Sequence, residues 1–132
     1  MKNHLSLLVP LLALVPSCFV AAAAGAGYVV SQQVLPNNVH VSEVSLDVDR
    51  VWPSVKETVG FYQEPGSQAS VQDFPRVIHA KVDGANVLVE VDALDIDRTT
   101  IRVSAEKYLN LAKDDATASL VMKAILDRLN KP

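Results

Sequence analysis

Residues 77–93 read VIHAKVDGANVLVEVDA, and this stretch decides the fold. Apolar and polar side chains alternate on both sides of Asp83-Gly84, a dipeptide that strongly favours a tight hairpin turn. A period of two residues is typical of strands with one buried face. The stretch therefore predicts two antiparallel strands, over residues 77–82 and 87–93, joined by a turn.

The alternation continues after a second predicted turn at residues 95–98, where residues 99–105 read TTIRVSA. The three segments form a meander with one apolar and one polar face, as an antiparallel sheet with one solvated side requires. The inward positions are apolar: Ile78, Ala80, Val82, Val87, Val89, Val91, Ala93, Ile101, Val103 and Ala105.

A helix is predicted before the meander, over residues 48–62. Asp47 is a good N-cap residue, and the apolar side chains that follow it recur at helical spacing. Pro53 removes one backbone donor, so this helix is either kinked there or regular only after Trp52. Trp52, the only tryptophan, is most simply the largest side chain of the core.

A second helix is predicted after the meander and ends at about Leu129. Asp114 and Asp115 supply a cap and first-turn charge, and Ala118, Val121, Met122 and Ile125 continue the apolar stripe. Residues 39–46 predict one more strand, with a bulge near Ser42-Glu43 to reconcile its apolar positions. The order β-α-β-β-β-α predicts an α+β two-layer sandwich, an antiparallel sheet with two helices on one face.

The connecting segments are rich in turn residues. Residues 63–75 are expected to form a loop, with a short strand around 69–72, and residues 106–113 form a connection. Residues 31–38 are polar and read as either a tether or a short edge segment.

The first 17 residues have the character of a signal peptide: Lys2, then an apolar run, then a small residue, Ser17, before Cys18. We assign residues 18–38 to a lipidated cysteine and an Ala/Gly-rich tether, and residues 39–132 to one small domain. Two alternatives remain open: an uncleaved helix from about Leu5 to Val30, long enough to span a bilayer, or ordinary cleavage near residues 24–26.

Composition limits the chemistry. Cys18 is the single cysteine, so the chain forms no internal disulfide and no cysteine-rich zinc site. The formal net charge is −3, and loss of Lys2 with the signal leaves 11 basic and 15 acidic residues, or −4. That balance argues against nucleic acid as a partner, because such proteins carry a basic patch.

No catalytic motif, metal site or cofactor site is predicted. His40 and His79 lie on separate strands without metal-ligand spacing, and no glycine-rich phosphate loop is present. Asp92, Asp95 and Asp97 suggest a calcium loop only weakly, because the glycine and distal glutamate of an EF-hand are missing; a solvated turn is the simpler interpretation. The polar sheet face offers a partner surface, which we assign to Lys81, Glu90, Asp92 and Arg102.

Residues 14–18, LVPSC, resemble the lipobox of bacterial lipoproteins, although Pro16 departs from its usual pattern. The resemblance implies a diacylglyceryl thioether on Cys18, removal of residues 1–17 and acylation of the new amino terminus with a fatty acid such as palmitate. Two or more acyl chains anchor a protein durably. Because no Asp follows Cys18, the resemblance further implies the outer membrane, facing the periplasm.

The chain from Cys18 onward resembles a family of small bacterial lipoproteins of uncharacterised function. The similarity runs through residues 25–29 (GAGYV), 46–52 (LDVDRVW), 100–103 (TIRV) and 114–126 (DDATASLVMKAIL). The family usually has Gly-Asp where this chain has Lys113-Asp114. The resemblance implies an α+β fold in the cell envelope and no known activity.

Three functions are compatible with these features. The first is a non-enzymatic, membrane-anchored envelope lipoprotein that acts as an interaction or scaffold module. The second is a small-ligand or lipid binder with a cavity between helices and sheet. The third, an enzyme, would need a cleft that gathers His40 or His79 with carboxylates.

Overall fold

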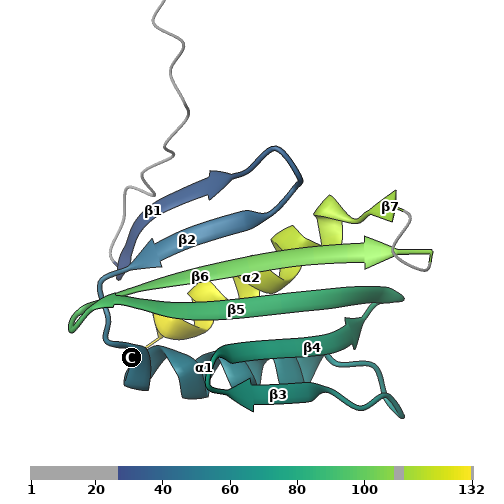
Figure 1. Cartoon of the computed structure of the whole chain (residues 1–132), viewed down its shortest axis with the longest axis horizontal. Helices are drawn as coiled ribbons and strands as arrows, with labels where there is room; N and C mark the ends of the chain where they lie inside the picture. The colour runs from purple at the N-terminus through teal and green to yellow at the C-terminus, as the bar shows by residue number, and fades with distance from the viewer. Residues whose placement is uncertain (1–26, 109–111, 132) are drawn as a thin grey trace, which may run out of the picture.

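The computed structural model describes residues 27–108 and 112–131, so the predicted signal peptide and lipidation site, Cys18, lie outside the described residues. The chain folds into one antiparallel sheet with both helices packed behind it in the view of Figure 1. Its elements are β1 (Val29–Val34), β2 (His40–Val44), α1 (Val48–Tyr62), β3 (Ser70–Asp73), β4 (Arg76–Val82), β5 (Ala85–Asp95), β6 (Arg98–Lys107), β7 (Ala112–Lys113) and α2 (Asp115–Leu129).

The strand order across the sheet is β1-β2-β6-β5-β4-β3, and β7 pairs with β6. Every pair is antiparallel. The predicted two-layer α+β sandwich with its central meander β4-β5-β6 is confirmed. Three short strands extend the predicted order. β3 at one edge matches the short strand expected around residues 69–72, β1 at the other edge occupies part of the stretch expected as a tether or edge segment, and β7 beside the end of β6 was not predicted.

The core lies between the sheet and the helices. Along β4, β5 and β6 buried side chains alternate with more exposed ones as far as Val82, Val91 and Ala105, as the sequence predicts, and Val89, Ile101 and Val103 are fully enclosed. The prediction that Ala93 faces inward is wrong: Ala93 is exposed, at the end of the sheet where the pairing of β5 with β6 shifts register between Ala93 and Asp95. α1 contributes Val51, Trp52 and Val55 to the same layer. No helix of the described residues covers the opposite face of the sheet (Figure 1). Most side chains of that face are exposed or half-buried, whereas Val41 is 9% exposed.

The turn between β4 and β5 has the predicted form. Asp83 and Gly84 are its two residues, with φ of 54° and 79°. Positive φ at both central positions gives a turn whose twist matches the strands, and glycine occupies such a position without a steric cost. This turn fixes the register in which Val82 faces Ala85.

Both helices begin at the predicted caps. The Asp47 carboxylate accepts a hydrogen bond from the Arg50 backbone N–H at 2.9 Å, and Asp114 accepts one from Thr117 at 3.1 Å. Pro53 lies inside α1, which continues without interruption to Tyr62. Trp52 is 6% exposed, so its predicted place in the core is confirmed.

β2 corrects one sequence prediction. β2 itself has no bulge near Ser42-Glu43, because it pairs with β6 in continuous register from His40 to Val44. The register shift in this region is in β1, between Val29 and Ser31, opposite Val44 and Glu43. Ser42 therefore shares the helix-facing side with Val44, while Val41 lies on the other side. Because Ser42 is polar but occupies a core position, the apolar residues of β2 do not alternate regularly in the sequence, and this irregularity predicts a bulge that the strand does not have.

β1 occupies part of the stretch predicted as a tether or edge segment, and over residues 29–34 it is an edge strand paired with β2. The ordered domain therefore begins before Val39. Since Val29 and Val30 belong to this strand, a helix from Leu5 does not extend to Val30. In the described part of the chain, no helix has the length and apolar character needed to cross a membrane.

Candidate functional site

The face of the sheet opposite the helices is the candidate site, and it contains all four residues of the predicted partner surface. Glu90 on β5 lies directly across from Arg102 on β6, and Asp92 lies across from Thr100. Opposite charges at such cross-strand positions are close enough to interact. The structure nevertheless shows no ion pair between Glu90 and Arg102 among the described residues, which leaves both charged groups available to a partner.

Lys81 does not join the other three. It lies opposite Asn86, whereas Val77, four residues earlier on β4, is the residue opposite Glu90. Four residues of strand span about 13 Å. The predicted surface is therefore two areas on one face: an acidic and basic area around Glu90 and Arg102, and a second area around Lys81.

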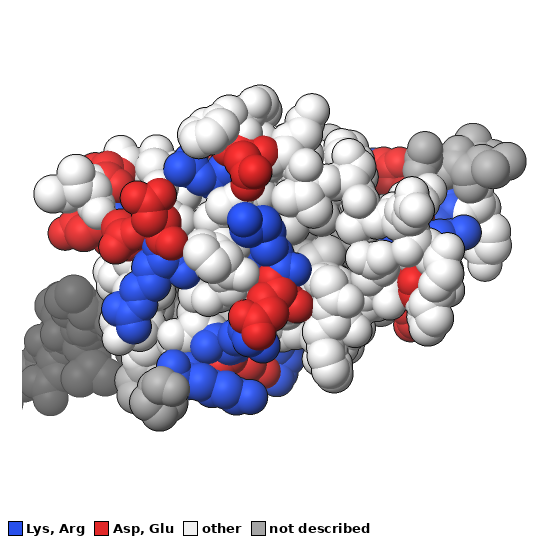
Figure 2. Space-filling view, turned by 90° about the horizontal axis from the view of Figure 1, so that it is seen from below, with Lys and Arg blue, Asp and Glu red and all other residues white. Residues whose placement is uncertain are grey.

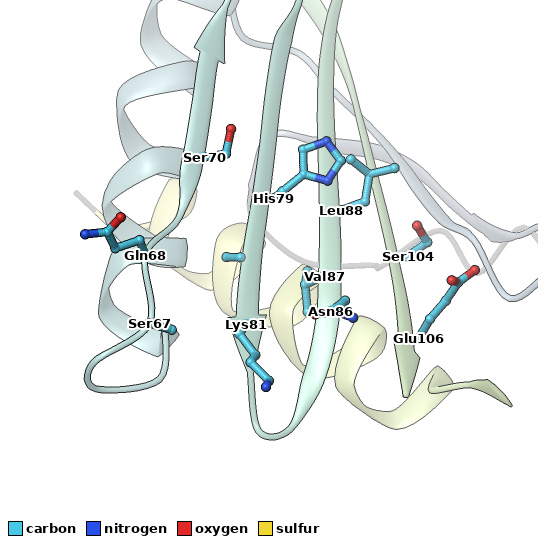
Figure 3. Close-up of a pocket in the computed structure, with 11 residues that line it drawn as sticks. Ser67, Gln68, Ser70, His79, Lys81, Asn86, Val87, Leu88, Ser104 and Glu106 are labelled. Atoms are coloured by element: carbon cyan, nitrogen blue, oxygen red, sulfur yellow. The ribbon is translucent and has the colours of Figure 1, made fainter. Parts of the chain in front are cut away.

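The area around Lys81 is a groove of about 550 Å³. One row of side chains crosses four strands in register: Ser70 faces His79, His79 faces Leu88, and Leu88 faces Ser104. Figure 3 shows the His79 ring beside Leu88 on the open side of the sheet, with Lys81 and Glu106 toward the next turn. We call this hollow the sheet groove; its lining is Ser67, Gln68, Ser70, His79, Ala80, Lys81, Asn86, Val87, Leu88, Ser104 and Glu106.

One wall of the sheet groove comes from the loop that follows α1. The Gln63 amide donates to the Ser67 carbonyl at 2.6 Å, and the Ser67 hydroxyl donates to the Glu64 carbonyl at 2.6 Å. The Glu64 backbone N–H in turn donates to the Lys81 carbonyl at 2.8 Å. These bonds tie the loop to the end of β4, so the wall keeps a fixed position beside the sheet.

The chemistry of the sheet groove is that of a polar recognition surface. His79, Lys81 and Glu106 supply an imidazole, an ammonium and a carboxylate, with serine hydroxyls between them. Glu106 also pairs with Lys113 of β7. In the described residues, no three histidine, cysteine or acidic side chains come together as a metal site would need. The groove can therefore bind a polar group through hydrogen bonds and charge, with Leu88 giving apolar contact.

The two histidines of the domain lie on opposite faces. His79 is on the open face, whereas His40 points to the helix side, where its Nε2 lies 2.7 Å from Asp115 Oδ1 at the start of α2. The enzyme hypothesis needs a cleft that gathers His40 or His79 with carboxylates. The sheet groove contains His79 and one carboxylate, Glu106, and His40 contacts one carboxylate, Asp115.

The acidic set considered as a calcium loop forms the β5–β6 turn. Asp95 Oδ2 accepts a hydrogen bond from Arg98 Nε at 2.8 Å, and this bond lowers the pKa of Asp95. The hydrogen bond and negative charge of Asp95 raise the pKa of Asp97. Asp92 lies farther back on β5, opposite Thr100. This arrangement is a charged turn closed by an arginine.

The charge distribution agrees with the composition. Seen from the β3 side, Lys and Arg side chains alternate with Asp and Glu, and neither sign forms a continuous patch on that face (Figure 2). Nucleic-acid binding needs a basic stripe, which this face does not show.

Comparisons with known proteins do not identify the chain: no family model, curated protein or solved structure matches it. The resemblance to small bacterial lipoproteins therefore stays a prediction from the sequence.

Sequence reasoning found the charged half of the open face and missed the sheet groove. Ser70, Leu88 and Ser104 carry no motif and become neighbours only through the register of four strands. Ser67 and Gln68 belong to a loop whose path depends on three hydrogen bonds. The signals in the sequence were His79 and Lys81, both placed on the polar side of their strand, and Lys81 belonged to the predicted partner surface.

Proposed function

We propose that this protein is a non-enzymatic envelope lipoprotein, anchored to a membrane through lipid on Cys18, that binds another envelope protein through the open face of its sheet. The observation that carries the binding role is that face itself. One side of the sheet is covered by two helices, whereas the other presents charged and polar side chains and the sheet groove.

The face carries charged groups that a partner protein can recognise. Glu90 and Arg102 lie side by side without an ion pair to each other, and Lys81 lies in the sheet groove about 13 Å away along the strand direction. Charged groups that are not already paired within the fold give specificity and orientation to a partner of complementary charge. A partner that covers both areas at once would contact most of β4, β5 and β6.

Anchoring is supported by the sequence alone. The lipobox resemblance at residues 14–18 and the apolar run before it imply lipidation of Cys18 and an outer-membrane location facing the periplasm. Attachment holds a binding module at high local concentration near membrane partners, which increases occupancy without any new contact.

Photo-crosslinking in intact cells tests the binding role. Lys81→p-benzoylphenylalanine and Arg102→p-benzoylphenylalanine place the reactive group in the two areas of the open face. Lys123→p-benzoylphenylalanine is the matched control, because Lys123 is an exposed basic residue on α2 behind the sheet. We expect the same crosslinked product from positions 81 and 102 and its absence from position 123.

Two outcomes would contradict the proposal. Identical products from all three positions would mean that the reactive group captures whatever is nearby. A lack of any product from positions 81 and 102, in cells where the protein is present at normal level, would mean that the open face has no partner.

A small-ligand binder is the second candidate, favoured only by the volume of the sheet groove. The site expected for it between helices and sheet is occupied by buried side chains such as Val55, Val89 and Ile125. A ligand would have to bind on the open side instead, against His79, Lys81 and Glu106. Such a ligand, when added, would reduce photo-crosslinking from position 81 and leave crosslinking from position 102 unaffected. This result would distinguish a small ligand from a protein partner.

A further inference from the structure

The end of the sheet at the β5–β6 turn exposes large apolar side chains. Ile96 in the turn is 91% exposed, Phe74 in the β3–β4 turn is 87% exposed, and Leu94 is 50% exposed. Exposed apolar residues also occur elsewhere in this domain, such as Phe61 and Tyr108, but three of them at one end offer a surface that an apolar environment can cover. We call these three residues the apolar tip.

The chain enters the fold at this same end. In the register of the sheet, Val29 faces Val44, Val44 faces Thr99, and Thr99 faces Ala93, so these residues form one row across β1, β2, β6 and β5. Residues before Val29 and the turn after Ala93 both project beyond this row. Figure 1 shows the start of β1 and the β5–β6 turn at the left end of the sheet.

The direction of this entry is fixed by contacts at Tyr28. Its backbone N–H donates to Asn130 Oδ1 at 3.1 Å, and its carbonyl accepts from the Ser45 N–H at 2.7 Å. The Arg50 guanidinium lies 5.2 Å from the centre of the Tyr28 ring. The residue before it, Gly27, therefore leaves the domain at a defined place at this end.

The short stretch between Cys18 and Gly27 sets the distance from the membrane. Nine residues reach at most about 30 Å even when fully extended. If lipid holds Cys18 in the bilayer, the end of the domain that carries Gly27 stays within about 30 Å of that bilayer. The apolar tip lies at this same end and is therefore within reach of the bilayer.

We propose that the apolar tip inserts into the interfacial region of the bilayer that holds Cys18, so that the domain stands on the membrane with its β5–β6 turn downward. The inference rests on the proposed lipid anchor. Apolar side chains that enter this region add to the binding supplied by acyl chains.

The charges near the tip indicate that the contact is apolar. Arg98 bridges Asp95 at 2.8 Å and Glu43 at 3.2 Å, so its charge is already compensated within the domain. Asp97 adds an acidic group beside Ile96, and Arg76 lies 5.6 Å from the centre of the Phe74 ring. Since these groups supply no excess of positive charge, docking is expected on zwitterionic lipid and should gain nothing from anionic lipid.

This orientation leaves the sheet groove accessible. β6 runs from Arg98 beside the tip to Lys107 at the far end, a span of about 30 Å. Glu106 and Lys81, at the groove, lie toward that far end. The proposed binding face would stand upright, with its charged area nearer the membrane and the sheet groove farther out.

The test uses the protein as it is extracted from membranes, reconstituted in phosphatidylcholine vesicles that contain nitroxide-labelled lipid. Ile96→Cys carries an environment-sensitive fluorophore at the tip. Tyr108→Cys carries the same fluorophore as the matched control, since Tyr108 is 76% exposed and follows the distal end of β6. We expect strong quenching at position 96 and almost none at position 108.

A second variant checks the apolar cause. Phe74→Ser and Leu94→Ser, combined with labelled Ile96→Cys, should reduce quenching at position 96 toward the value at position 108. Equal quenching at positions 96 and 108 in the parent proteins would overturn the docking proposal. Unchanged quenching after both serine substitutions would overturn the role of the apolar tip.

The unsubstituted protein separates failure of docking from failure of the anchor. A lipidated Cys18 has no free thiol, so this protein should take up no fluorophore and should float with the vesicles. Uptake of the fluorophore, or loss from the vesicles, would refute the anchor and the docking proposal with it. No uptake and normal flotation, together with an unquenched label at position 96, would refute docking alone.

Discussion

Replacement of Asp114 by alanine should weaken the domain more than any other single change at a helix end. The Asp114 carboxylate accepts hydrogen bonds from the Thr117 N–H at 3.1 Å and from the Thr117 hydroxyl at 2.6 Å. An ion pair joins it to Lys107 at 3.1 Å. Asp114 thus connects the end of β6 to the start of α2 on both sides of residues 109–111.

The expected loss in the free energy of unfolding has two parts. Removal of an N-cap carboxylate costs about 1 kcal/mol. Thr117 is 4% exposed, and leaving its hydroxyl without a partner adds about 1 kcal/mol more. The total, about 2 kcal/mol, corresponds to a fall in Tm of about 10 °C for a domain of this size.

Urea unfolding of the purified protein, followed through the fluorescence of the single tryptophan, Trp52, measures this loss. Asp127→Ala is the matched control, because Asp127 is also on α2 but its pair with Lys123 is solvent-exposed. Such exposed pairs contribute little to stability. If Asp114→Ala and Asp127→Ala lower the urea midpoint equally, Asp114 does not stabilise the domain as an N-cap of α2.

The pH dependence gives a separate check. Hydrogen bonds from Thr117 hold the pKa of Asp114 below its usual value of 3.8. A lowered folded pKa means that ionised Asp114 stabilises the fold above the unfolded pKa, and that this contribution is lost as pH falls through the folded pKa. Asp114→Asn keeps a capping oxygen without the charge. Its stability deficit should therefore shrink as pH falls below 3.8, and a deficit independent of pH would contradict the assignment.

Two further predictions concern single atoms of the core and backbone. Ser42 is 1% exposed and its hydroxyl has no hydrogen-bond partner in the described structure, so Ser42→Ala should raise the free energy of unfolding by about 1 kcal/mol. Ser45→Ala, at an exposed serine of the same segment, is the control. A Ser42→Ala variant that is less stable than the parent would show that the hydroxyl does have a partner. Gly60→Ala should stabilise α1 by about 0.5–1 kcal/mol, because an added Cβ there meets nothing within 4 Å. Gly84→Ala should destabilise by a similar amount, because its φ is 79°, and denaturation curves that give both alanine variants the same sign would contradict this account.

The parts of the fold that the sequence predicts best are those with a repeated pattern and a local boundary signal. α1 begins and ends where predicted, at Val48 and Tyr62, because an aspartate cap precedes a regular apolar stripe. The β4–β5 turn follows from Asp83-Gly84, whose backbone angles suit few other residue types. These features depend on neighbours in the sequence, so they can be derived without the structure.

The edges of the sheet follow less directly from the sequence, which predicts a short strand around residues 69–72 within a loop and leaves residues 31–38 as either a tether or an edge segment. β1 contains Gln32 and Gln33, and all four residues of β3 are exposed, so neither strand shows the alternation of a half-buried strand. Their positions are fixed by pairing with β2 and β4. β7 has two residues and exists only beside the end of β6.

The candidate site illustrates the same limit. Placement of Lys81, Glu90, Asp92 and Arg102 on one face follows from strand parity and is observed. Their separation into two areas depends on the register between β4 and β5, which parity does not give. The Trp52 indole N–H donates to Asp73 Oδ1 at 2.7 Å. Because Asp73 comes from the edge strand β3, this contact could not be predicted from the sequence either.

Lipidation of Cys18 is the claim on which both the proposed function and the membrane docking depend. The most direct test is the intact mass of the protein extracted from membranes, measured beside a Cys18→Ser variant. We predict a mass equal to residues 18–132 plus acyl chains, with this species absent from the variant. An unmodified full-length mass, or a mass that begins near Gly27, would contradict the anchor.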